Sequence, residues 1–266
     1  MFKTHKICAH VCSWKGPELL RVFIPNFLKS ISEDVNLKIV LNEADDESVQ
    51  ICRDYKVDFV AIDRNYGTLA VDFLIPFTHA EYVLQSNTDM FFPKGWDTAM
   101  LNVIEKNSNC SVSLSLCEPY GTGNSVVVVD NLGGFTEEGT YERFNENHKT
   151  GKYKLRNQVS YTHPILTKFS DLKAVGGYSD NMDLGWHPGY SCDNSFAFRL
   201  KQLHPDFQFI TLGDWCVYHA ISATNNKLPP EIKARNGINH FIHKYGQHWQ
   251  DFNNRIGLFN ELQINT

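Results

Sequence analysis

Short apolar segments alternate with amphipathic segments through the first third of the chain. Ile7 to Cys12 form an apolar run typical of a buried strand, and the apolar positions after it recur every three or four residues, as on one face of a helix. That face comprises Leu20, Phe23, Ile24, Phe27, Leu28 and Ile31. Because proline lacks an N–H and crowds the preceding turn, we expect Pro25 to kink this helix or shift its start.

The same alternation continues to about residue 85. Further strands are predicted over Leu37–Leu41, Asp58–Ile62 and Tyr82–Gln85, with helices between them over Glu47–Tyr55 and Thr68–Phe77. This order is typical of parallel strands joined by right-handed helical crossovers. We therefore predict an α/β fold with a Rossmann-like, mostly parallel central sheet flanked by helices.

Polar residues follow each of the four predicted strands. They are Ser13, Trp14, Asn42, Glu43, Asp45, Asp63, Asn87, Thr88 and Asp89. In open α/β sheets the ligands bind at the carboxyl ends of the strands, so we expect a binding site along this edge.

The rest of the chain is less regular. Between Cys117 and Tyr161 it is rich in Gly, Asn and Glu around one valine-rich strand, which predicts long loops or a hairpin outside the main sheet, forming a flexible flap. Gln208 to Leu212 resembles another strand. Beyond Pro230, the spacing of apolar residues predicts one amphipathic C-terminal helix. Those residues are Ile232, Ile238, Ile242 and Tyr245.

Composition excludes several classes of function. The formal net charge of −5 and the lack of a long basic run argue against a nucleic-acid partner. The longest apolar run, Val126 to Val129, is far shorter than the roughly 20 residues of a membrane span, and the first residues lack a signal-peptide pattern. The seven scattered cysteines predict reduced thiols and a cytoplasmic protein. No dinucleotide fingerprint, Walker phosphate loop or nucleophile elbow is present, which disfavours hydride transfer.

The order of motifs from about Lys6 to Thr224 resembles the family 2 glycosyltransferases of the GT-A fold. The first strand with Ser13 and Trp14, the strand ending in Asn42 and Glu43, and the Asn65-Tyr66-Gly67 segment are similar to the nucleotide side of that family. The resemblance implies that the nucleotide of a nucleotide-sugar is bound by Ser13, Asn42, Glu43, Asp63, Asn65 and Asn87.

The segment from Tyr82 to Asp89 lies where this family has its Asp-x-Asp metal motif. A divalent cation stabilises the charge that develops on a leaving diphosphate, and carboxylates are suitable ligands for it. The resemblance implies a Mn²⁺ or Mg²⁺ cofactor held by Asp89 and by His219, which lies late in the sequence. Asp89 is expected to face solvent. Asn87 replaces the usual first acid, which would weaken the metal site. Alternatively, Asp89 is a turn or cap residue and His219 an ordinary half-buried histidine.

A second group of motifs resembles the catalytic half of the family. It comprises Gly176-Gly177-Tyr178, Gly185-Trp186, Cys192-Asp193-Asn194 and Arg199-Leu200. The resemblance implies that Asp193 is the general base for the acceptor hydroxyl, with Cys192 in place of a family glutamate. Trp186 and His187 would line the sugar pocket, or else pack within a loop. Since a helix is predicted to begin just after Asp193, that side chain also suits an N-cap.

These observations together predict a single domain over residues 1–266. Its nucleotide-sugar-binding half would extend to about residue 90, its acceptor and catalytic half over about 91–224, and a helical segment over about 225–266. The predicted activity is inverting transfer of a sugar to a glycan or other hydroxyl acceptor. Two alternatives stay open: a nucleotidyltransferase, of which Lys15-Gly16 is a faint sign, and a non-catalytic sugar- or nucleotide-binding module.

Overall fold

The computed structural model describes residues 4–120, 127–155, 158–159, 163–178 and 192–220. The segment in which a C-terminal helix is predicted lies outside these residues, as do Trp186 and His187.

The first half of the sheet is parallel, as the sequence predicts. β1 (His5–Ser13) lies between β2 (Val35–Leu41) and β4 (Ala80–Asn87), and β3 (Asp58–Ala61) pairs with the outer side of β2. Both faces of these strands are covered by other elements, which explains why they read as nearly continuous apolar runs.

Two α-helices connect these strands. α1 (Pro17–Ser30) begins with a proline in its first turn, where a missing N–H has no helical partner to lose, and it continues through Pro25. The predicted shift of its start by Pro25 is therefore wrong. α2 (Asp46–Asp54) is capped by Asp45, whose carboxylate accepts the N–H of Ser48 at 2.7 Å.

The third connection is a 3₁₀-helix, η1 (Gly67–Phe77), and not the α-helix expected over Thr68–Phe77. Pro76 explains part of the difference, because in an α-helix its ring would crowd the carbonyl of Asp72 and its missing N–H would leave that carbonyl unpaired. At the end of η1, Thr78 donates its N–H to the carbonyl of Ile75 at 3.1 Å, which is 3₁₀ spacing.

The second half of the sheet contains both strand directions. The described strands follow the order β3-β2-β1-β4-β9-β6-β10-β5. β9 (Ile165–Lys168) is antiparallel to both β4 and β6 (Cys110–Glu118), so β6 again has the direction of β4. β10 (Gln208–His219) is parallel to β6, and the short β5 (Met90–Phe91) pairs antiparallel with its end. The carboxyl ends of β1, β2, β4, β6 and β10 therefore share one edge.

The expectation of loops or a separate hairpin between Cys117 and Tyr161 is wrong in two respects. The valine-rich strand β7 (Val127–Val129) pairs with β6 in the main sheet, and α4 (Thr140–Lys149) is a regular helix. α4 forms because Phe144 is fully buried in the main core while the polar residues around it face solvent. β8 (Gln158–Val159) pairs with β10.

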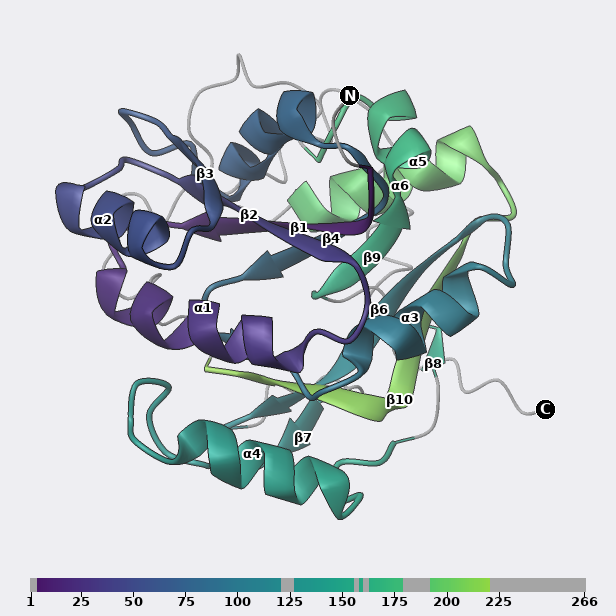
Figure 1. Cartoon of the computed structure of the whole chain (residues 1–266). Coiled ribbons are helices and arrows are strands. Elements are labelled where there is room, and N and C mark those ends of the chain that lie inside the picture. The colour runs from purple at the N-terminus through teal and green to yellow at the C-terminus, as the bar shows by residue number, and fades with distance from the viewer. Residues whose placement is uncertain (1–3, 121–126, 156–157, 160–162, 179–191, 221–266) are drawn as a thin grey trace.

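The helices cover the two faces of the sheet separately (Figure 1). α1, α2, α4 and α3 (Trp96–Ile104) contribute side chains to one apolar core. η1, α5 (Phe169–Ala174) and α6 (Cys192–Leu203) contribute to a second core on the opposite face. Among the helices of the described residues, none has the length and apolar character needed to cross a bilayer.

Phe144 offers a test of the role of α4. We predict that Phe144→Ala lowers the free energy of unfolding by roughly 3–5 kcal/mol, as is typical of a phenylalanine removed from a packed core. Phe77, whose side chain is 55% exposed, is the matched control, and Phe77→Ala should change it by less than about 1 kcal/mol. Equal losses for the two variants, measured by urea denaturation, would show that α4 is not part of the main core.

Candidate active site

Polar side chains from several strand ends meet at the carboxyl edge of the sheet. Asp89 lies in the two-residue turn between β4 and β5, Glu118 is the last residue of β6, and His219 is the last residue of β10. The backbone holds these segments together, because His219 pairs with Met90 and the N–H of Ala220 donates to the carbonyl of Asp89 at 3.0 Å.

The imidazole of His219 lies between two carboxylates. Its Nδ1 is 2.8 Å from Oε1 of Glu118, a hydrogen bond, and its Nε2 is 3.8 Å from Oδ2 of Asp89. The side chains of Glu118 and Asp89 are only 4% and 9% exposed, against 19% for His219. His219 is therefore oriented from one side by Glu118 and presents its other ring nitrogen towards Asp89.

Opposing effects act on the protonation of His219. Burial on its own lowers the pKa of an imidazole, but the neighbouring charge of Asp89 and the hydrogen bond and charge of Glu118 outweigh burial, and the pKa of His219 is raised. The site is thus a compact group of two acids and one base.

Asp89 is buried, and the expectation that it faces solvent is wrong. The turn that carries it is covered by the pairing of β5 with β10. Its Oδ1 atom is buried and has no hydrogen-bond partner among the described residues. A buried carboxylate oxygen without a partner is unfavourable in the free protein, and a cation at this position would satisfy it.

Asp89 and His219 suit a divalent cation whose remaining coordination positions are filled by a bound substrate and by water. Within the described part of the chain, no group of three or more His, Cys, Asp or Glu side chains is arranged to hold a metal. Mg²⁺ sites, however, commonly use one or two carboxylates, with the remaining positions filled by substrate phosphates and water. Asp89 and His219 supply such a partial set. His219 would donate its Nδ1 N–H to Glu118, as metal-binding histidines commonly do with their other ring nitrogen.

Asn42 and Asn65 form a network that shapes the loop after β3. Asn42 is buried, and its amide donates to Oδ1 of Asn65 at 2.7 Å and to the carbonyl of Gly67 at 3.1 Å. Its own oxygen accepts the N–H of Tyr66 at 2.8 Å, and Asn65 accepts the N–H of Gly67 at 2.7 Å. Both side chains hold the start of η1 against the end of β2.

Glu43 is held by two residues that follow β1. Its carboxylate accepts a hydrogen bond from the indole N–H of Trp14 at 2.8 Å and pairs with the Lys15 ammonium at 2.8 Å. The hydrogen bonds from Lys15 and Trp14 lower the pKa of Glu43, so it is ionised near neutral pH. Glu43 and Lys15 both have positive φ angles, 57° and 46°, which are uncommon for residues with a side chain. Such conformations are often found at functional sites.

The other predicted nucleotide-binding residues occupy the same edge. Ser13 is buried at the end of β1, and its carbonyl accepts the N–H of Asn42 at 2.8 Å. Asn87 is half-buried at the end of β4, where it lies opposite Cys12 in the register of β1. Asp63 is exposed in the loop after β3. The edge thus brings together residues from four strands.

Asp193 is the second residue of α6. The helix therefore begins two residues earlier than expected, and Asp193 lies in its first turn and not at its N-cap. The backbone at this position is described, but the surroundings of the side chain are not.

Glu118 is a candidate site residue that sequence reasoning missed. It follows Cys110 to Cys117, in which serines alternate with apolar residues at the period of a strand, and it stands at the carboxyl end of that strand. The pattern that located the other strand-end residues was therefore present here too.

No family model matches the sequence, and no curated protein matches it. Solved structures do match the fold. Residues 1–349 of TarS from S. aureus match over 81% of this chain and 60% of theirs, with a TM-score of 0.56 and 12% identity. The complex of that TarS fragment with UDP-GlcNAc matches over 87% of this chain and 61% of its own, with a TM-score of 0.58 and 12% identity.

A second protein gives a similar match. The mannosyltransferase PcManGT from Pyrobaculum calidifontis, solved with GDP-Man and Mn²⁺, matches over 84% of this chain and 59% of its own, with a TM-score of 0.57 and 12% identity. The chain spans about 60% of the TarS fragment. The expected fold is thus confirmed: the chain has the mixed α/β, GT-A-like fold of these glycosyltransferases, with a large sheet flanked by helices.

Proposed function

We propose that this chain is a glycosyltransferase that moves a sugar from a nucleoside diphosphate sugar to a hydroxyl of a glycan or other acceptor, with inversion and with help from Mn²⁺ or Mg²⁺. The observation that carries the proposal is the group of Asp89, His219 and Glu118 at the carboxyl edge of the sheet, where one buried oxygen of Asp89 has no hydrogen-bond partner among the described residues. In open α/β sheets this edge is where ligands bind.

The TarS and PcManGT complexes support the donor class. TarS was solved with UDP-GlcNAc and with UDP, and PcManGT with GDP-Man and Mn²⁺. Their donors share a diphosphate between nucleoside and sugar, and a diphosphate leaving group is what a cation bound by Asp89 would stabilise. When bound, the cation supplies a Lewis acid for the leaving oxygen. Asp89 and His219 would hold it, and Glu118 fixes the orientation of His219.

The nucleoside would lie over the ends of β1 to β4. In this proposal Ser13, Glu43, Asp63 and Asn87 contact the nucleoside or ribose. Asn42 and Asn65 act through the loop that their hydrogen bonds shape.

Transfer would proceed by one displacement at the anomeric carbon of the sugar. The acceptor oxygen forms a bond to this carbon on the face opposite the diphosphate, and the bond from the carbon to the phosphate oxygen breaks with its electron pair. Asp193 takes the proton from the acceptor hydroxyl, as a general base does. A single displacement inverts the configuration of the anomeric carbon.

The acceptor half of the proposed single domain would extend over about residues 91–224, with Trp186 and His187 beside the sugar.

The odd number of scattered cysteines supports the further proposal that the protein works in the reducing cytoplasm.

The first test is donor turnover. With Mn²⁺ and a panel of UDP- and GDP-sugars, we predict release of nucleoside diphosphate by the wild-type protein. Asp89→Asn, which keeps the shape of the side chain but removes the charged metal ligand, should reduce turnover by roughly 10²-fold or more. The exposed Asp46 provides the matched control, and Asp46→Asn should retain full activity.

Each alternative function has its own result in this assay. Release of pyrophosphate would indicate a nucleotidyltransferase, and saturable donor binding without turnover would indicate a binding module. Full activity of Asp89→Asn in Mn²⁺ would disprove the metal assignment.

The second test concerns Asp193. We predict that Asp193→Asn slows transfer by roughly 10²-fold or more, the usual effect of removing a general base, while donor affinity and melting temperature stay near wild type. Asp206, exposed shortly after α6, gives the matched control Asp206→Asn. Wild-type transfer rates for Asp193→Asn, measured with the best donor of the panel, would leave Asp193 a purely structural residue of the first turn.

A further inference from the structure

β10 departs from regular pairing midway along its length. Leu212 lies opposite Leu114 and Cys216 opposite Ser115, so the residues between them, Gly213 to Trp215, have no partner positions on β6. The irregular segment is nevertheless held in place. The carbonyl of Gly213 accepts the N–H of Leu155 at 2.9 Å, and the hydroxyl of Ser115 donates to the carbonyl of Trp215 at 3.0 Å. Irregularities of this kind redirect side chains and are frequent beside functional sites.

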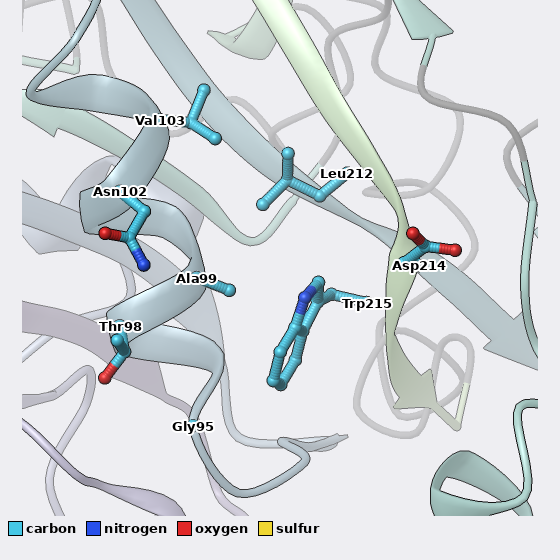
Figure 2. Close-up of a pocket in the computed structure, with 8 residues that line it drawn as sticks. All are labelled: Gly95, Thr98, Ala99, Asn102, Val103, Leu212, Asp214 and Trp215. Atoms are coloured by element: carbon cyan, nitrogen blue, oxygen red, sulfur yellow. The ribbon is translucent and has the colours of Figure 1, made fainter.

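The redirected side chains line a groove between β10 and α3. Figure 2 shows the indole of Trp215 projecting from β10 into this space, with Thr98 and Asn102 along the facing helix, whereas the carboxylate of Asp214, at the margin of the groove, points away from the indole. The groove has a volume of about 540 Å³, within the usual range of roughly 300–1,000 Å³ for small-ligand sites. It is open to solvent, since Asn102 and Asp214 are exposed and Trp215 is half-buried.

Two neighbours fix the position of the indole. Gly95, at the start of α3, has a φ of +88°, and a Cβ built there would lie 3.4 Å from the ring of Trp215. A residue with a side chain would be strained by this φ angle, and its Cβ would touch the edge of the ring. On the α4 side, the ring centroid of His148 lies 5.4 Å from that of Trp215. The indole is thus held in one position by its neighbours and offers an aromatic surface to a ligand.

The charge of the groove limits what it can bind. Asp214 is the one charged side chain among the described residues that line it. Burial lowers the pKa of His148, so this imidazole is neutral near pH 7 and adds no positive charge. A carboxylate without a cation beside it repels phosphates and other anions. The lining therefore suits an uncharged ligand with an apolar surface and many hydroxyl groups.

We propose that this groove binds a neutral saccharide. The C–H surface of a sugar ring would pack against the indole of Trp215, which provides a large apolar contact. The sugar hydroxyls would hydrogen-bond with Asn102, which can both donate and accept, and with Asp214, which accepts. Thr98 would only accept, because its hydroxyl donates to Oε1 of Glu33 at 2.7 Å. Few polar groups placed around an apolar surface are typical of ligand sites.

This site is separate from the proposed transfer site. Trp215 precedes His219 by four residues of β10, which corresponds to roughly 13 Å at the rise of an extended strand. The proposal goes beyond the proposed function and does not depend on it, because saccharide binding in the groove requires neither the donor nor a metal.

Calorimetric titration of the whole protein with chitotetraose, maltotetraose and mannotetraose, without nucleotide or metal, tests the proposal. We expect at least one to bind, Trp215→Ala to weaken that binding by roughly tenfold or more, and Asn102→Ala by roughly threefold or more. Tyr55, the C-cap residue of α2, is 39% exposed, and Tyr55→Ala is the matched control that should bind as the wild type does. Asn102 is exposed, so Asn102→Ala should fold and still tests the proposal if Trp215→Ala does not fold.

Three results would overturn the proposal. The first is that none of the three saccharides binds. The second is that the Asn102→Ala variant binds as tightly as the wild type. The third is that UDP or GDP with Mn²⁺ displaces the saccharide competitively, which would place the sugar in the transfer site. Failure of the proposed transferase activity would appear instead as absent donor turnover, with the groove titration unchanged.

Discussion

The contact of His219 with Glu118 and Asp89 depends on how three strands meet. Glu118 and His219 are neighbours because β6 and β10 run parallel and end together, and Asp89 reaches them because β5 pairs with the end of β10. Two buried carboxylates beside one imidazole would repel each other without a positive charge between them. Strand pairing holds the three side chains in this arrangement, and a site that stabilises negative leaving groups needs such preorganisation.

The antiparallel strand β9 makes this arrangement possible. It separates β4 from β6 yet leaves them with the same direction, so the carboxyl ends of both halves of the sheet lie along one edge. The loops that follow β1, β2 and β3 supply the residues proposed for the nucleoside. The turn after β4 and the end of β10 supply Asp89 and His219, which are proposed to hold the metal, and the end of β6 supplies Glu118, which orients His219. One edge thus brings together the two parts of the proposed donor site.

The sequence predicted the first half of this fold well because its signals are local. The strands β1 to β4 are short apolar runs, and α2 (Asp46–Asp54) nearly coincides with the helix predicted over Glu47–Tyr55. The second half depends on contacts that are distant in the sequence. β9 is a four-residue strand whose direction is set by both of its neighbours, and the pairing of β7 with β6 has no sequence signature. α4 was missed because one buried residue, Phe144, defines its apolar face.

The candidate site, like the fold, could be predicted only in part from the sequence. Its strand-end position located Asp89, and the family resemblance pointed to His219. The burial of Asp89 follows from β5, which is too short to recognise by its period. Glu118 could have been found from the alternation of Ser and apolar residues before it. The groove beside Trp215 could not be found in this way, since it depends on a break in the register of β10 with β6 and on the packing of α3 beside it.

The central claim is that Asp89 and His219 bind a divalent cation together with a nucleoside diphosphate. Histidine ring signals in NMR spectra test it most directly, because paramagnetic Mn²⁺ broadens the signals of nuclei close to it. With Mn²⁺ and UDP or GDP, the account predicts loss of the His219 ring signal, assigned with His219→Gln. The signal of His10, which is buried against Thr78 at 2.6 Å, should persist. A His219 signal that stays sharp at saturating Mn²⁺ and nucleotide would contradict the account.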